Sequence, residues 1–142
     1  MRNRFIASLL LVLFLSILGI AQTSQAGEER ILKHYLEQIL LTDPAFSGFD
    51  VKQGEAIYFN IHTHSKGETR ACADCHSGDP RQPSQHITTG KPIDPLAPSV
   101  NSERFTELKK TEKWFRRNCK WTIERECTSE EKGHFIVYLQ SL

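Results

Sequence analysis

Apolar residues of this 142-residue chain are concentrated at its start. Residues 5–21 are almost unbroken apolar, two arginines precede them, and the small residues Ser24 and Ala26 follow them. A positive start, an apolar segment and small residues at a cleavage position form the three-part secretory pattern. We therefore predict a signal peptide over residues 1–26, a mature domain over residues 27–142 and, in a bacterium, a periplasmic protein. An uncleaved membrane anchor is the alternative, because about 17 apolar residues approach the length that spans a bilayer.

The next part of the chain carries two helical patterns of apolar positions. From Glu28 to Leu41 apolar residues recur at spacings of three and four, which predicts an amphipathic helix. Asp50 is a suitable N-cap for a second helix that runs from Val51 to about Asn60. Gly54 and Tyr58 lie one turn apart in this second helix, so another helix can approach closely over the glycine.

Two more helices are expected in the second half of the chain, beyond a proline-rich loop. Five prolines fall within residues 77–101, and a loop of this length inside a small domain is usually functional. Thr111 begins a short helical pattern that continues through Asn118. Thr128 is followed three residues later by Glu131, which is a capping box that opens a final helix. Because strand-like alternation of any length is missing, we predict an all-α domain.

Charge and composition narrow the classes of function. Residues 27–142 contain 16 basic and 17 acidic side chains, so the domain lacks the basic footprint of a nucleic-acid-binding protein. Apolar residues are sparse in the same part, and a small domain buries a limited share of its surface. A bound apolar group would complete such a core. We expect a monomer without stable membrane association once the signal peptide is removed.

The segment Cys72-Ala73-Asp74-Cys75-His76 is the strongest chemical motif. Cys-x-x-Cys-His is the spacing of c-type haem attachment, in which the thiols bond to the porphyrin and the imidazole becomes the proximal iron ligand. A thioredoxin-like redox pair would need a βαβ context, and a zinc site would need further Cys or His ligands at suitable spacing. We predict one covalent haem c, held by Cys72, Cys75 and His76.

The sixth iron ligand is not a methionine sulfur, because the single methionine is Met1. An imidazole, an amide, a lysine, water or an open position remain. The histidines outside the haem motif are His34, His62, His64, His86 and His134. Of these, His62 and His64 come just before the motif. Ligation by two histidines would describe a plain electron carrier.

Cys119 and Cys127 are left over after the haem motif is assigned. In an oxidising compartment such a pair is expected to form a disulfide, which for this short loop contributes roughly 2.5 kcal/mol in the chain-entropy model. Asn118 directly precedes the first of these cysteines. Taken alone, Asn118 is a candidate for a helix C-terminal residue, since Asn tolerates the left-handed conformation.

Smaller hypotheses concern residues around the haem motif. Pro95 is placed to offer a backbone carbonyl to the ring N–H of His76, with simple loop rigidity as the alternative. Lys91 and Arg104 are candidates to pair with the haem propionates, with solvated charge as the alternative. Trp114 is expected to pack against the haem or in the core.

Six short motifs in the second half of the chain point to one family. They are Thr89-Gly90-Lys91, Pro95-Leu96-Ala97-Pro98-Ser99, Arg104-Phe105-Thr106, Glu112-Lys113-Trp114, Arg117-Asn118-Cys119 and Arg125-Glu126-Cys127-Thr128. Together they resemble the sphaeroides haem protein family, whose members are small oxygen-binding cytochromes c with one haem. The resemblance covers about residues 30–140. It implies a class I cytochrome c-like domain wrapped around one covalent haem, with an extra N-terminal helix.

The resemblance also implies roles for individual residues. In this family the asparagine of the Arg-Asn-Cys motif ligates ferric iron and leaves on reduction, so that ferrous haem binds oxygen or nitric oxide. Carried over, Asn118 is the distal ligand and catalytic residue, and Cys119 is bridged to Cys127. The implied electron donor is a dihaem cytochrome c, and the implied activity is that of a terminal oxidoreductase acting on oxygen or nitric oxide. A bis-histidine electron carrier and a gas-binding module without turnover are the alternatives.

Overall fold

A computed structural model of the chain describes residues 25–142. Most of the predicted signal peptide therefore lies outside the described residues. The chain is helical over residues 25–40, and eight further elements follow. They are α2 (Val51–Phe59), β1 (His62–Thr63), β2 (Thr69–Arg70), α3 (Ala73–His76), β3 (Ser84–Gln85), β4 (Pro92–Ile93), α4 (Leu108–Ile123) and α5 (Ser129–Gln140). Within residues 25–142, none of the helices is long and apolar enough to cross a membrane.

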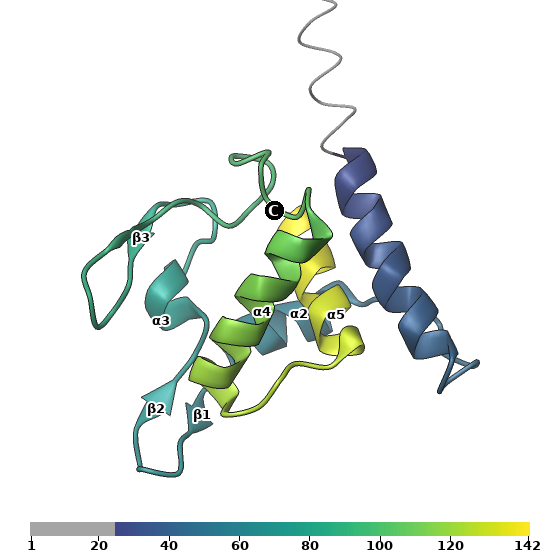
Figure 1. Cartoon of the computed structure of the whole chain (residues 1–142). Helices are drawn as coiled ribbons and strands as arrows, with labels where there is room; N and C mark the ends of the chain where they lie inside the picture. Colours follow the sequence, from purple (N-terminus) through teal and green to yellow (C-terminus); the bar gives the residue numbers. More distant parts are fainter. Residues whose placement is uncertain (1–24) are drawn as a thin grey trace, which may run out of the picture.

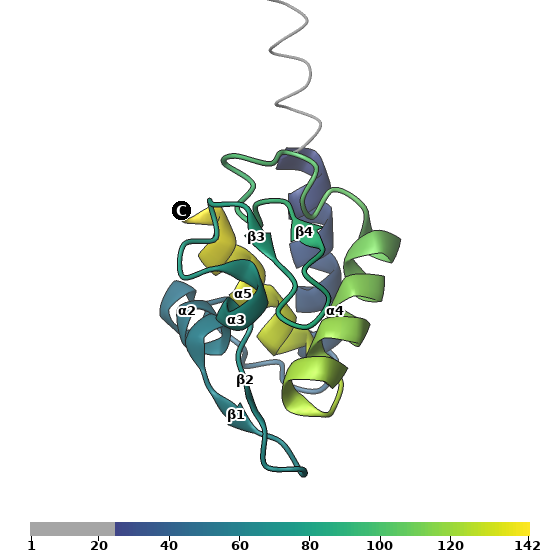
Figure 2. The ribbon, with the colours of Figure 1, turned by 90° about the vertical axis from the view of Figure 1, so that its left-hand side faces the viewer.

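The helices surround a common core, and the haem motif lies at its edge. Figure 1 shows α3 and the β3–β4 hairpin on one side of α4 and the N-terminal helix on the other, and Figure 2 shows the molecule from the hairpin side, with the N-terminal helix behind. The main core cluster joins Ile31 and Tyr35 of the N-terminal helix to Phe115 of α4 and Ile136 of α5. The additional N-terminal helix is therefore part of the core.

The expected helix starts were found where capping chemistry predicted them. The side chain of Asp50 accepts a hydrogen bond from the Gln53 backbone N–H (2.8 Å) and caps α2. At the start of α5, both hydrogen bonds of the capping box between Thr128 and Glu131 are present. These signals act within a single turn, so they do not depend on the remainder of the fold.

The helix predicted from Thr111 is longer than expected at both ends. α4 begins at Leu108, because Leu and the two lysines that follow it are good helix formers. It continues to Ile123, and Glu124 ends it in the left-handed conformation with φ 55°. Asn118 therefore lies inside the helix, and the interpretation of this residue as a helix end is wrong.

A close crossing between α2 and α5 fixes the position of the haem motif. A Cβ atom at Gly54 would lie 2.0 Å from the carbonyl oxygen of His134, so only glycine fits this crossing. One turn later, the buried Tyr58 hydroxyl lies 2.9 Å from the carbonyl oxygen of His76 and 2.6 Å from that of Ser77. The crossing thus holds the end of the Cys-x-x-Cys-His segment against α2.

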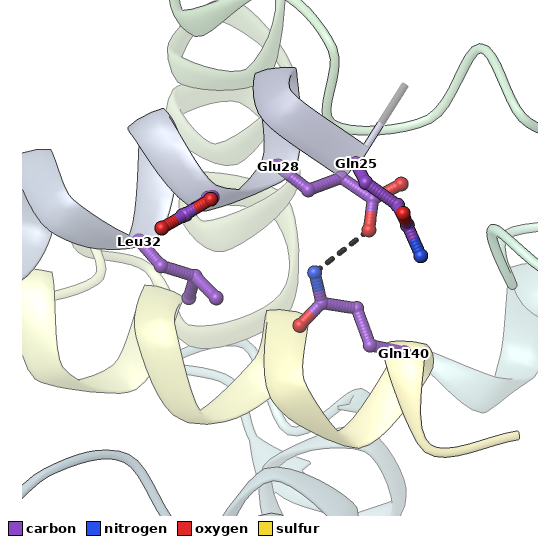
Figure 3. Close-up of a pocket in the computed structure, with 5 residues that line it drawn as sticks. Gln25, Glu28, Leu32 and Gln140 are labelled. Atoms are coloured by element: carbon purple, nitrogen blue, oxygen red, sulfur yellow. Dashed lines mark hydrogen bonds between the residues drawn. The ribbon is translucent and has the colours of Figure 1, made fainter. Parts of the chain in front are cut away.

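Polar contacts also join the N-terminal helix to the other helices. The Tyr35 hydroxyl donates to Glu112 of α4 (2.6 Å), and the same carboxylate accepts from Lys132 of α5 at 3.0 Å. At the other end, the Gln140 amide donates to Glu28 across 2.8 Å (Figure 3). A cavity of about 480 Å³ lies beside this second contact and contains none of the predicted site residues.

Four strands of two residues each depart from the expected all-helical pattern. β1 pairs with β2 and β3 pairs with β4, both antiparallel, to give two separate hairpins. Two residues are too few to show the alternation that identifies a strand in a sequence. The β3–β4 hairpin orders part of the proline-rich loop, and the domain remains mainly helical (Figure 2).

Candidate haem site

The haem motif forms a single helical turn, α3, with Cys72 at its N-cap and Cys75 within it. The carboxylate of Asp74 accepts a hydrogen bond from the Ala71 backbone N–H (2.7 Å) and closes this turn. Cys72 and Cys75 are both free thiols in the structure. Burial raises the pKa of Cys72 to about 11, so its thiol is protonated at neutral pH. Neither sulfur atom is in a disulfide, so both are available for covalent attachment.

The imidazole of His76 is held without a hydrogen-bond partner on one nitrogen. Its Nδ1 atom is buried and unpaired, the one such side-chain atom among residues 25–142. Burial, followed by the nearby charges of Arg104 and His86, lowers the pKa of His76 to about 4. The ring is therefore neutral at physiological pH, which is the form that binds a metal. An unpaired, neutral imidazole next to two free thiols fits covalent haem.

The carbonyl proposed to meet His76 has other partners. The oxygen of Pro95 accepts from the Asn101 side-chain amide (3.0 Å) and from the Arg104 guanidinium (2.8 Å). Arg104 also donates to the Asp94 carbonyl at 2.6 Å. The hypothesis of a bond from Pro95 to His76 is therefore wrong for this structure, because both acceptor directions of that oxygen are occupied. Arg104 is therefore not a solvated charge, since it braces this loop.

Three stripes of different chemistry run along α4. Successive residues of a helix are about 100° apart, so residues three and four apart share a side. The buried stripe packs in the core and consists of Thr111, Phe115, Cys119 and Thr122. A second stripe consists of Trp114, Asn118 and Trp121, and both Trp114 and Asn118 are exposed. The third stripe consists of basic residues.

The stripe that contains Asn118 lies on the side of α4 that faces the haem motif. The Arg70 guanidinium lies 4.3 Å from the centre of the Trp121 ring, and the His86 ring lies 5.9 Å from it. His86 belongs to the β3–β4 hairpin, whose Ser84 hydroxyl donates to the carbonyl oxygen of Cys75 (2.7 Å). Figure 2 shows the β3–β4 hairpin between α3, which ends at His76, and α4.

The last turn of α4 is held in place by a disulfide and by the β1–β2 hairpin. Cys119 is bonded to Cys127, with 5.7 Å between their Cα atoms. Arg70 donates to the carbonyl oxygen of Trp121 (2.9 Å), and His64 bonds that of Thr122 (2.8 Å). These carbonyls have no partner within the helix itself. The backbone that carries Asn118 is thus fixed on its C-terminal side.

Two of the candidate histidine ligands have both ring nitrogens next to other groups of the protein. His64 is buried, with Nε2 on Thr122 and Nδ1 3.7 Å from Glu124. His134 is also buried: its Nδ1 accepts from the Asp50 N–H at 2.7 Å, and its Nε2 lies 3.3 Å from Glu130. Both rings serve packing between elements, so neither is available to iron.

The remaining candidate histidines are His34, His62 and His86. His34 bonds Gln38 on the N-terminal helix, and His62 lies in β1. His86 lies in the β3–β4 hairpin, and the Ser84 hydroxyl of that hairpin donates to the carbonyl oxygen of Cys75 (2.7 Å), so the structure brings His86 toward the haem motif. Its Nδ1 faces the backbone N–H groups of the turn, 3.2 Å from that of Thr88. The sequence included His86 among the candidates, but its place in a long loop left its neighbours undefined.

Comparison with known proteins gives the family of this chain. A family described as a domain of unknown function, DUF1924, matches residues 44–139. The chain belongs to the DUF1924 family. It is 32% identical over 111 residues to cytochrome c'' of Methylophilus methylotrophus, covering 78% of this chain and 77% of that protein. It is 40% identical over 90 residues to cytochrome c-type protein SHP of Cereibacter sphaeroides, covering 63% of this chain and 69% of that protein.

Solved structures of the same two relatives share the fold of this DUF1924 member. The crystal structure of oxidized cytochrome c'' from Methylophilus methylotrophus superposes with a TM-score of 0.75 at 31% identity, covering 82% of this chain and 94% of that one. Oxidized SHP, described as an oxygen-binding cytochrome c, gives a TM-score of 0.69 at 33% identity, covering 81% and 96%. The predicted family and fold class are confirmed. Because these relatives are cytochromes c, they imply haem c for this chain.

Proposed function

We propose that this protein is an exported, periplasmic cytochrome c that accepts electrons and binds a diatomic gas, oxygen or nitric oxide, beside Asn118. Cys72 and Cys75 would hold one haem c through thioether bonds, with His76 as proximal ligand. The bound haem supplies a redox-active iron with a position for an exchangeable ligand. The likeness to SHP, whose structure is described as that of an oxygen-binding cytochrome c, favours this function.

The observation that carries the proposal is the setting of Asn118 on α4. This exposed amide lies between two tryptophans, on the side of α4 that faces the β3–β4 hairpin and the haem motif. Its neighbour Cys119 is in a disulfide, so the backbone is fixed while the side chain stays free to turn. His64 and His134 are bonded elsewhere, which removes two competing ligands.

An amide suits a ligand that must leave when the iron is reduced. It is neutral and binds iron more weakly than an imidazole or a thioether does. An amide ligand would stabilise the ferric state most, whereas ferrous iron bound to an imidazole would favour diatomic π-acceptors. Two side-chain torsions are enough to move the amide of Asn118 away, and no backbone motion of α4 is required. Reduction and gas access would thus be coupled through one side chain.

Substitutions of Asn118 test this function directly. The Asn118→Ala protein should show a ferric visible spectrum shifted toward high spin and should still bind carbon monoxide after reduction with dithionite. The Asn118→His protein should be low-spin in both oxidation states and should bind carbon monoxide slowly. Lys110→Ala, an exposed change on the basic side of the same helix, is the matched control and should leave both spectra unchanged.

One observation favours a second candidate function, a bis-histidine electron carrier. His86 lies in the hairpin that Ser84 joins to Cys75 of the haem motif, and its ring lies 5.9 Å from that of Trp121, one turn beyond Asn118. If His86→Ala raised the ferric spin state while Asn118→Ala left it unchanged, the ligand would be His86 and the gas-binding function would be wrong. Reduced wild-type protein would then show a sharp low-spin α band that carbon monoxide does not alter.

The electron donor and the reaction are proposed from the family resemblance. A dihaem cytochrome c is the proposed donor, and reduction of oxygen or conversion of nitric oxide is the proposed activity. Mixing the reduced protein with oxygen or nitric oxide, with the donor in excess, should give sustained consumption of the gas. A single binding event without turnover would identify a gas-binding module instead.

A further inference from the structure

The third stripe of α4 is a row of exposed cations. We call it the basic stripe; its members are Lys109, Lys110, Lys113, Arg116, Arg117 and Lys120, all of them exposed. Within residues 25–142, Lys120 is the one member that has a carboxylate in salt-bridge range, 3.5 Å away on Glu126. The stripe therefore presents several cations that no carboxylate of this part of the chain neutralises.

The basic stripe makes the charge of the domain strongly uneven. α4 holds six basic residues and one acidic residue, whereas the other residues of 27–142 include ten basic and sixteen acidic ones. A nearly neutral domain thus has one positive helix on a negative body. Such a distribution orients an approaching charged partner and raises its rate of association.

Folding alone does not account for these cations. Lys113 is one turn from Lys109, Lys110, Arg116 and Arg117, and like charges at these spacings destabilise a helix. An anionic surface placed against the stripe would remove this repulsion. The stripe therefore has the properties of a binding surface for negative charge.

The basic stripe borders the stripe that contains Asn118. The Trp114 ring of that stripe adjoins the basic stripe, with the Arg117 guanidinium 5.1 Å and the Lys113 ammonium 6.0 Å from its centre. Trp114 is 43% exposed, although tryptophan is among the most apolar residues. A partner seated on the basic stripe would touch this ring and would stand next to the candidate haem site.

We propose that the basic stripe, together with Trp114, docks an acidic redox protein that exchanges electrons with this cytochrome. This inference rests on the proposed function. A 16-residue helix is about 24 Å long, which suits the small interfaces of transient electron-transfer complexes. A protein partner fits better than an anionic membrane or nucleic acid, because either extended anionic surface would also repel the negative body around α4.

The test reverses two charges of the stripe and compares them with a matched pair. The double variant Lys113→Glu and Arg116→Glu changes the stripe, and the double variant Lys52→Glu and Lys66→Glu makes the same change in net charge at exposed sites elsewhere. Both use the full haem-loaded chain. Oxidation of the reduced protein by hexacyanoferrate(III), at low salt, should slow about tenfold in the stripe variant and less than about twofold in the control. Oxidation by the cationic hexaammineruthenium(III) should not slow in either.

A second measurement keeps docking separate from the proposed haem function. In an NMR titration with a decaglutamate peptide, amide shifts should map to α4 in the wild type and in the control but be lost in the stripe variant. Absence of a haem spectrum would contradict the proposed function alone, since the peptide titration does not require electron transfer. Equal slowing of both variants, peptide shifts outside α4, or tighter salt-sensitive binding to phosphatidylglycerol vesicles or duplex DNA would overturn the docking proposal.

Discussion

Replacement of Gly54 by alanine tests whether the crossing of α2 and α5 supports both the fold and the haem motif. The added Cβ would lie 2.0 Å from the carbonyl oxygen of His134 and 2.7 Å from the Cβ of Tyr138. Ordinary contacts begin near 3.4 Å, so the helices must separate by about 1 Å or more. Neither obstacle can move by changing a rotamer, because one is backbone and the other is the first atom of a side chain.

The expected loss of stability follows from two opposing terms. Overpacking costs typically about 1–3 kcal/mol, and a clash with backbone belongs at the upper end. The higher helix propensity of alanine offsets about 1 kcal/mol of this loss of stability. We therefore expect Gly54→Ala to lower the free energy of unfolding by about 2 kcal/mol, which corresponds to a fall in Tm of roughly 8 °C for a domain of this size.

The assay is thermal and urea unfolding followed by circular dichroism, with the haem spectrum recorded in parallel. The matched control is Gly78→Ala, because no heavy atom lies within 4 Å of a Cβ at that exposed site. The control should be unchanged or slightly more stable. The haem band of Gly54→Ala should be lost at the lower temperature as well, since Tyr58 on the same helix holds the carbonyl of His76. A Gly54→Ala protein as stable as the control would refute the close crossing.

Three further predictions concern covalent chemistry and pH. Mass spectrometry of exported protein should show residues 27–142 plus one haem, and Cys72→Ser together with Cys75→Ser should abolish the added mass; haem retention there would contradict the attachment. Thiol titration of unfolded, unreduced protein with haem attached should find no free thiol, and Cys127→Ser should lose roughly 2.5 kcal/mol of stability; an equally stable variant would argue against a structural bridge. The hydrogen bond from Arg125 chiefly lowers the pKa of Glu131, so this carboxylate stabilises the native state above its ordinary pKa, and the effect is lost as pH falls through the lowered value. Glu131→Gln should therefore cost about 1 kcal/mol at pH 7 in urea unfolding and progressively less as the pH falls below the ordinary pKa of the carboxyl and through its lowered value; a pH-independent difference would exclude this linkage.

The features that sequence alone determined are those that depend on residues within about one helical turn. The Asp50 cap, the capping box of Thr128 and the Cys-x-x-Cys-His spacing each need only local chemistry, and the structure has both caps where they were predicted. The pairing of Gly54 with Tyr58 indicated a helix crossing for the same reason, since a missing side chain one turn from an aromatic ring leaves room for a second helix. The haem ligands remain predictions from that motif.

The availability of each candidate ligand was decided by contacts between distant residues. His64 bonds a carbonyl 58 residues away, and His134 accepts from an N–H 84 residues away. Two-residue strands that carry too little alternation to be seen in a sequence bring His86 toward the haem motif and hold the end of α4. A side chain can bind iron only if neighbouring elements leave its donor atom unbonded. That condition depends on packing among elements far apart along the chain, so the tertiary structure alone separates His64 and His134 from Asn118.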